Sequence, residues 1–316
     1  MTGPQTYRVL AYNTSKQSEN KIHDDTVARK YGFSGGLVPG VDVIAYMMHQ
    51  PIAKWGRAFL ERGLIDARFL KPVYDGEIAE VRAVEQGGVL ALEVESRGEL
   101  CATGSASLPA SVPSFTLADF KDVPPVAERR PVSASSYEVD KWLGTVPREW
   151  AGSAATEYLA DIRETDPVFA REGLGHPGLL QRMMNKVLVD NAILGPWIHV
   201  GSKMQLLSAA ETGDELTARA RVIGNYEKKG HRFVELDALV LANGKTPLAH
   251  CWHIAIYQPR EQAAAYWMPR SSRGMTVVGV CGRATNRDSS WPGLPRPSIN
   301  LRKTHCCDGL PGQARQ

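Results

Sequence analysis

Residues 36–48 read GLVPGVDVIAYMM, and residues 173–184 repeat the same plan as GLGHPGLLQRMM. In each stretch, a glycine-containing loop ends in Pro-Gly and leads into a segment with little polar surface. A helix that is apolar on nearly every side must be enclosed by other elements rather than laid on a surface. The sequence therefore predicts two enclosed helices, one in each half of the chain.

Strand patterns follow both predicted helices. Residues 216–222 alternate between apolar and polar side chains, which is typical of a half-buried strand, and Asn243-Gly244 is a strong two-residue hairpin signal. In the first half, Gly87-Gly88 and Arg97-Gly98 separate further strand-like runs in the same way. An apolar helix followed by an antiparallel meander, twice, predicts an α+β fold in which a sheet wraps each helix.

The positions of proline suggest how the chain is divided. Its 316 residues are enough for about two domains. Six prolines fall between positions 109 and 147, and the segment after residue 260 has neither structural period. We expect an N-terminal domain at 1–110, a proline-rich connection at 111–149, a C-terminal domain at 150–260 and a disordered tail at 261–316.

Composition excludes several classes of protein. The net charge is +3, but eight basic and three acidic residues lie after residue 260, which leaves 29 basic against 31 acidic residues before it. With no basic stripe, we expect no nucleic-acid partner. The apolar runs are too short for a membrane span, and residues 1–8 lack the apolar core of a secretory signal, so we expect a cytoplasmic protein. The five cysteines show no zinc-binding spacing, and we expect no metal.

The stretch that carries the strongest candidate catalytic residues includes the start of the first predicted helix. Residues 18–40 read SENKIHDDTVARKYGFSGGLVPG. His23 can both accept and give a proton near neutral pH. Gly40 would leave a backbone amide exposed at the positive end of the helix dipole, where it could contact a carbonyl oxygen. The separation along the chain allows the two to face one pocket, although only geometry decides this.

This stretch resembles the MaoC-like dehydratases and (R)-specific enoyl-CoA hydratases, whose pattern runs through an Asn and a His to a Gly-Phe pair and a glycine at the start of the central helix. The positions that fit are Asn20, Ile22, His23, Ala28, Gly32, Phe33, Val38 and Gly40. The resemblance implies a double hotdog, with two antiparallel sheets each wrapped around a central helix. It also implies hydration or dehydration of an acyl thioester, in fatty acid metabolism, without a cofactor.

The resemblance assigns roles to individual residues. His23 would be the catalytic acid or base, Gly40 would polarise the thioester carbonyl, and Asn20 would fix the loop or the pocket. The partner would be an acyl-CoA or acyl-carrier thioester, and a homodimer is compatible with the fold. The second half lacks a motif histidine, since Glu164 stands near the corresponding place. One site per chain, in the N-terminal half, is therefore expected.

Departures from the family pattern leave the catalytic carboxylate open. Ser18 stands where the family has its aspartate, and a serine hydroxyl is no base at neutral pH without an activator. Glu19 or Asp42 could substitute, although a loop charge and a helix first-turn acid explain them as well. Two alternatives follow: a thioesterase on the same fold, and a non-catalytic acyl-thioester-binding or structural hotdog protein.

Other polar residues have structural explanations that we prefer. His176 lies beside the second helix start, where a hydrogen-bonded structural role is commoner than a functional one. His250, Cys251 and His253 could ligate a metal, but adjacent residues of a strand point to opposite faces. The basic residues of 228–232 could meet CoA phosphates, although a solvated turn explains them better.

Overall fold

The computed structural model describes residues 5–114, 116–150 and 152–260, so the predicted tail lies outside the described residues. The strands are β1 (Gln5–Leu10), β2 (Leu64–Phe69), β3 (Ile78–Gln86), β4 (Val89–Ser96), β5 (Glu99–Ser107), β6 (Trp142–Gly144), β7 (Arg148–Glu149), β8 (Ile198–Leu206), β9 (Glu215–Lys228), β10 (His231–Ala242) and β11 (Thr246–Gln258). The α-helices are α1 (Asp25–Lys30), α2 (Gly40–Trp55), α3 (Arg57–Arg62), α4 (Gly152–Asp161), α5 (Val168–Glu172) and α6 (Gly178–Val189). Short 3-10 helices are η1 (Lys21–His23), η2 (Leu117–Asp119) and η3 (Ala134–Tyr137).

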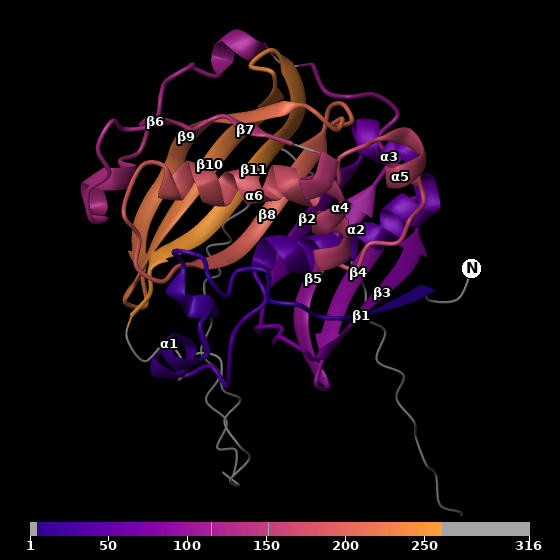
Figure 1. Ribbon diagram of the computed structural model, residues 1–316, viewed down its shortest axis with the longest axis horizontal. Helices are drawn as coiled ribbons and strands as arrows, with labels where there is room; N and C mark the ends of the chain where they lie inside the picture. The colour runs from indigo at the N-terminus through magenta and orange to yellow at the C-terminus, as the bar shows by residue number, and fades with distance from the viewer. Residues whose placement is uncertain (1–4, 115, 151, 261–316) are drawn as a thin grey trace, which may run out of the picture. The chain divides into compact units, whose positions relative to one another are not determined.

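The strands form one antiparallel sheet in the order β1-β3-β4-β5-β2-β8-β11-β10-β9-β6, with β7 also paired to β9. The α+β double hotdog expected from the sequence is confirmed, with one refinement. Instead of two separate sheets, β2 and β8 pair edge to edge and join the two halves, as Figure 1 shows. Pairing these two strands leaves neither edge open to other chains.

The two predicted helices lie at the centre of the halves. In α2, eleven of the 16 residues are buried, and α2 packs against β1 to β5 and against α6. Helix α6 packs against β9, β10 and β11, within the concave face of the second half of the sheet (Figure 1). The all-round apolar pattern predicted this enclosure, because a helix without a polar face is most stable when every side is shielded from water.

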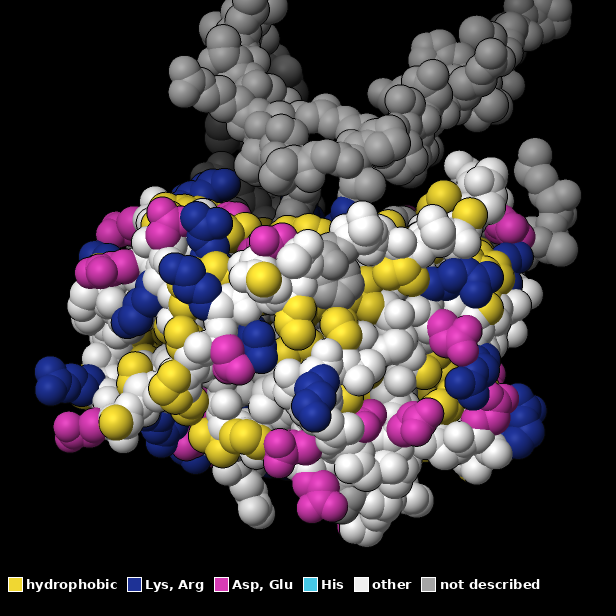
Figure 2. All heavy atoms as spheres, turned by 90° about the horizontal axis from the view of Figure 1, so that it is seen from above, with side chains coloured by type: hydrophobic (Ala, Val, Ile, Leu, Met, Phe, Trp, Pro, Cys, Tyr) yellow, Lys and Arg dark blue, Asp and Glu magenta, His cyan; other side chains and the backbone are white. Residues whose placement is uncertain are grey.

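Charged side chains of both signs are interspersed on the face of the protein shown in Figure 2, with hydrophobic side chains between them. Some charged side chains of the protein form ion pairs across adjacent strands, such as Arg82 of β3 with Glu95 of β4 at 2.8 Å. Among the described residues, no helix has both the length and the apolar character required to cross a membrane.

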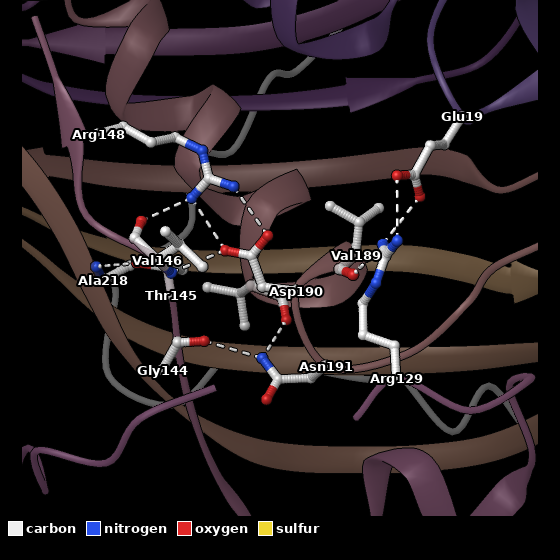
Figure 3. Close-up of polar contacts among 11 residues, drawn as sticks. Glu19, Arg129, Gly144, Thr145, Val146, Arg148, Val189, Asp190, Asn191 and Ala218 are labelled. Carbon is white, nitrogen blue, oxygen red and sulfur yellow. Dashed lines mark hydrogen bonds and ion pairs between the residues drawn. The ribbon is translucent and has the colours of Figure 1, made fainter. Parts of the chain in front are cut away.

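The segment 111–149, expected to be a connection, also contributes secondary structure to the second half. Its strands β6 and β7 pair with β9, and its side chains hold the end of α6, as Figure 3 shows. Arg148 donates to both carboxylate oxygens of Asp190 at 2.9 and 2.8 Å, and Asn191 donates to the carbonyl of Gly144 at 2.8 Å. The segment therefore fixes the C-terminal end of α6 in place.

Candidate functional site

A small cavity lies between the two halves of the fold, beside the start of α2. Its volume is about 70 Å³, and most of its wall is apolar. The first half contributes Asn20, His23 and Gly40, and the second half contributes Asn185 of α6 and His199 of β8. The structure therefore brings the three residues of the sequence motif together and adds two polar side chains from the other half.

Local capping explains how the motif loop reaches the cavity. The Asn20 side chain accepts a hydrogen bond from the amide of Ile22 and so begins η1, which ends at His23. Asp24 then caps α1 by accepting from the amides of Thr26 and Val27. Two consecutive caps hold the turn rigidly, because each satisfies amides that would otherwise have no acceptor. His23 is consequently fixed at the turn between them.

The hydrogen bonds of His23 define which ring nitrogen carries its proton. Nδ1 lies 2.8 Å from the carbonyl oxygen of Leu37, which can only accept, so Nδ1 carries the hydrogen and donates. Nε2 then accepts from the Asn20 side-chain amide at 3.2 Å. The lone pair on Nε2 is where this neutral ring would accept a proton as a general base, and to do so the Asn20 amide must give up its contact.

Burial keeps His23 in this neutral form. Only 8% of the residue is exposed, and burial lowers the pKa of His23 below its usual 6.5, against a smaller opposing effect from the Leu37 carbonyl. The ring's hydrogen bonds go to a carbonyl and an amide, and neither partner is a carboxylate that would favour the charged form.

Asn20 connects the motif loop to the second half. Its Nδ2 donates to the carbonyl of Trp197 at 2.9 Å, and its Oδ1 accepts from the amide of Trp197 at 3.1 Å. The same side chain therefore orients His23 and fixes the segment just before β8. The expected role of Asn20 in fixing the loop or the pocket stays a prediction, and these contacts show where it would act.

Gly40 is the first residue of α2, so its amide has no acceptor within the helix. A Cβ atom at this position would lie 2.9 Å from Nδ1 of His199 and 3.1 Å from its Cγ. Only glycine lets the helix start and the imidazole of β8 approach this closely. The requirement for glycine therefore comes from tertiary packing as well as from the exposed amide.

The structure does not bring the other catalytic candidates into the cavity. Ser18 donates to the carbonyl of Asn20 at 3.3 Å, and Glu19 pairs at the surface with Arg129 at 2.9 Å (Figure 3). Asp42 is fully buried, but its carboxylate accepts from Thr14 and pairs with Arg182 at 2.9 Å. Since both oxygens of Asp42 are engaged, the geometry favours a role in joining α2 to α6.

The start of α6 differs from that of α2 because its own neighbours occupy it. The amide of Gly178 donates to Nδ1 of His176 at 3.0 Å, and a Cβ at Gly178 would collide with the hydroxyl of Tyr158. Burial lowers the pKa of His176 to about 4, with Glu164 at 3.8 Å as a weaker opposing influence. This arrangement is a packed polar cluster, which supports placing the site beside α2.

The remaining sequence candidates lie elsewhere. His250 contacts Asp237 at 2.6 Å, whereas His253 contacts Ser202 at 3.0 Å, so the two histidines face different partners. Among the described residues, no three His, Cys, Asp or Glu side chains are grouped so that they could hold a metal. The turn at 228–232 joins β9 to β10 and does not line the cavity.

Sequence reasoning missed His199 and Asn185. Both line the cavity, and each has a buried side-chain atom without a hydrogen-bond partner in the described structure, Nδ1 of His199 and Oδ1 of Asn185. Inward position on β8 and α6 could have been predicted from periodicity. Their place beside Gly40 in one cavity could not have been predicted, because it depends on how the halves pair.

Comparison with known proteins identifies the fold. No protein-family model matches the sequence, and no curated protein matches it. Among solved structures, a putative MaoC-domain dehydratase of Chloroflexus aurantiacus aligns with a TM-score of 0.56 at 9% identity, covering 81% of this chain and 95% of that one. A conserved hypothetical protein of Mycobacterium tuberculosis with a double hotdog fold also scores 0.56, at 12% identity over 81% of this chain and 96% of its own.

A third structure, a MaoC-like dehydratase, aligns with a TM-score of 0.50 at 13% identity, over 80% of this chain and 98% of its own. At such low identity these matches establish architecture rather than chemistry. They agree with the topology described above and with the resemblance carried by residues 18–40. The chain has a double hotdog fold, as the mycobacterial protein does, and its architecture also matches the two MaoC dehydratases.

Proposed function

We propose that the chain is an acyl-thioester hydratase or dehydratase with one active site, at the cavity beside α2. The observation that carries the proposal is the meeting of His23, Asn20 and the Gly40 amide around one cavity. The fold similarity to MaoC-like dehydratases adds support at the level of architecture. The same residue types were expected from the sequence motif.

The chemistry follows from the hydrogen-bonding state of His23. In hydration, a water takes the place of the Asn20 amide at Nε2 of His23, and Nε2 takes a proton from this water while the water oxygen bonds to the β-carbon of an enoyl thioester. The electrons of the double bond move towards the thioester oxygen, where the Gly40 amide stabilises the developing negative charge. The imidazolium then returns its proton to the α-carbon, and dehydration is the reverse.

The size of the cavity points to a short acyl group. Its volume of about 70 Å³ is well below the roughly 300–1,000 Å³ of pockets that hold drug-sized ligands. A thioester with a few carbons suits this space better than a long chain. We therefore expect a four-carbon enoyl-CoA to be hydrated faster than a long-chain one.

The direct test is hydration of crotonyl-CoA by the purified chain, measured as the loss of enoyl absorbance. We expect His23→Ala to lower the rate by at least about a hundredfold, the usual scale for a general acid–base group. His250→Ala is the matched control, because His250 does not line the cavity and contacts Asp237 instead. Equal rates for wild type and His23→Ala would end the proposal.

The alternative of binding without turnover has a specific observation in its favour: neither hydrogen-bond partner of His23 is a carboxylate. In that case the chain would bind butyryl-CoA but would not hydrate crotonyl-CoA. A Ser18→Asp variant that gained hydration would show that the reaction depends on the carboxylate absent here. A thioesterase would instead release free CoA from butyryl-CoA, which a thiol reagent detects.

A further inference from the structure

His199 presents an unused hydrogen-bonding atom beside the candidate site. The residue is 8% exposed, lies in β8 and lines the cavity. Its Nδ1 is buried without a partner in the described part of the chain, and it abuts the position where a Cβ of Gly40 would stand. A buried polar atom without a partner carries a desolvation cost, so its place at a cavity wall indicates a ligand.

The other nitrogen of His199 belongs to a chain of three side chains. Nε2 lies 2.7 Å from Oγ of Ser202, which lies 3.0 Å from Nδ1 of His253. The two imidazoles stack with their centroids 4.3 Å apart. A serine hydroxyl has one hydrogen, so it donates to one imidazole and accepts from the other. The proton position on His253 therefore determines that on His199.

The surroundings of His253 favour one direction for this chain. Its Nε2 is also buried without a partner among the described residues. His253 does not line the cavity, so a hydrogen on its Nε2 would meet no acceptor even with a ligand bound, whereas a hydrogen on Nδ1 of His199 lies beside the cavity. The hydrogen of His253 therefore belongs on Nδ1. His253 then donates to Ser202, and Ser202 donates to Nε2 of His199. This leaves the hydrogen of His199 on Nδ1, where it faces the wall formed by Gly40.

Both rings stay uncharged in this arrangement. Burial, and secondarily the neighbouring His253, hold the pKa of His199 well below its usual value, and burial lowers the pKa of His253 to about 3. A neutral imidazole can donate a hydrogen bond without attracting a counterion, and it changes no charge within the working pH range. The group is thus suited to donating rather than to proton transfer.

We propose that Nδ1 of His199 donates a second hydrogen bond to the thioester carbonyl oxygen, beside the Gly40 amide, and that Ser202 and His253 are positioning residues that fix its tautomer. The inference rests on the proposed function for its reaction, but its binding component can be tested separately. His199 is then a catalytic residue contributed by the second half of the fold to a motif located in the first.

Binding is tested with two ligands that differ at the carbonyl. Butyryl-CoA has the thioester carbonyl, and S-butyl-CoA has a methylene in its place. By titration calorimetry, we expect the wild-type chain to bind butyryl-CoA about tenfold more tightly. His199→Phe, which retains a ring of similar size, should lose much of that preference. His250→Phe is the matched control and should keep it.

Rates of crotonyl-CoA hydration test the reaction. Removing one donor to a developing oxyanion lowers kcat about a hundredfold, so we expect this drop in His199→Phe, with KM raised by no more than the roughly tenfold loss of carbonyl binding seen in calorimetry. His199→Asn retains an amide donor near the Nδ1 position and should recover much of the loss. Ser202→Ala should lower kcat less than His199→Phe, because the donor remains but its tautomer is no longer fixed. Thermal melting verifies that each variant is folded.

The outcomes separate the two proposals. If wild type hydrates crotonyl-CoA and folded His199→Phe retains its kcat and its carbonyl preference, the inference is wrong while the function stands. Suppose that the wild type prefers butyryl-CoA but does not hydrate crotonyl-CoA, and that His199→Phe lacks this preference. The proposed function is then wrong, while the binding role of His199 stands. Equal affinity of wild type for both ligands would also overturn the role of His199.

Discussion

His23 and His199 face the same cavity with different hydrogen-bonding states. The ring of His23 donates from Nδ1 to the carbonyl of Leu37, which leaves Nε2 as an acceptor. In the tautomer proposed for His199, Nε2 accepts from Ser202 and Nδ1 is a donor. One neutral imidazole can therefore accept a proton while the other donates a hydrogen bond. Asn20 contributes to the first arrangement through its 3.2 Å contact with Nε2 of His23.

The pH dependence of the reaction tests the state of His23. Burial lowers the pKa of His23 below 6.5, and the neutral ring is the active base, so the rate should fall only when pH drops below that value. Asn20→Asp places a carboxylate near Nε2, which favours the charged ring, so its acid limb should move to higher pH. The measurement is kcat/KM for crotonyl-CoA across pH.

The control for that experiment is Asn20→Ala, which removes the hydrogen bonds to Trp197 without adding a charge. It should lower the rate but leave the acid limb below 6.5. Two results would contradict the assignment of His23 as a buried neutral base. One is a wild-type rate that begins to fall at or above pH 6.5, and the other is an Asn20→Asp rate that falls at the same pH as that of wild type.

Contacts between elements place these residues. The start of α2 lies against β8 at Gly40 and His199. Helix α2 is joined to α6 by the ion pair between Asp42, which is fully buried, and Arg182, which is partly buried. A buried ion pair does little for net stability, but it strongly penalises arrangements that separate its members. The pair therefore favours one relative placement of the two central helices.

The contact between α2 and β8 predicts the effect of a single methyl group. Gly40→Ala places a Cβ 2.9 to 3.1 Å from three atoms of the His199 side chain, so the helix or the ring must move. Overpacking of this kind typically costs about 1–3 kcal/mol. Chemical denaturation should show that loss in the free energy of unfolding, together with lower activity.

Gly195→Ala is the matched control, because a Cβ at Gly195 meets no atom within 4 Å. Its free energy of unfolding should stay close to that of wild type. If Gly40→Ala were as stable and as active as Gly195→Ala, the close approach of α2 to β8 would be wrong.

The whole molecule depends on pairing between its halves. Strands β2 and β8 continue one sheet across the middle, with Ile65 opposite Met204 and both side chains fully buried. The cavity lies at this junction, so each half supplies part of its wall. Neither half alone would hold the complete set of polar groups.

Buried neutral histidines predict instability in acid. Burial lowers the pKa of four histidines below the usual 6.5. The pKa of His176 falls to about 4 and that of His253 to about 3, and the pKa values of His23 and His199 are also lowered. The unfolded chain therefore binds more protons below pH 6.5, so stability is greatest above that pH and falls towards the folded pKa values. Each such histidine lowers the free energy of unfolding by about 1.4 kcal/mol per pH unit, between pH 6.5 and the pKa of the histidine in the folded chain.

Urea denaturation at several pH values between 7 and 5 measures this loss. His253→Phe removes one of the titrating groups, so its stability should depend less steeply on pH than that of wild type. Equal free energies of unfolding at both ends of the range would contradict the burial of these rings in neutral form.

The sequence alone determined the architecture and the motif half of the candidate site. Two helices without a polar face, each followed by hairpin signals, require sheets to cover them, and local caps at Asn20 and Asp24 place His23. Only the tertiary structure decided that Asp42 pairs with Arg182 and that His199 meets Gly40. These contacts join residues far apart in the chain, and the register of β2 against β8 and the packing of α2 on α6 set them, which no local pattern encodes.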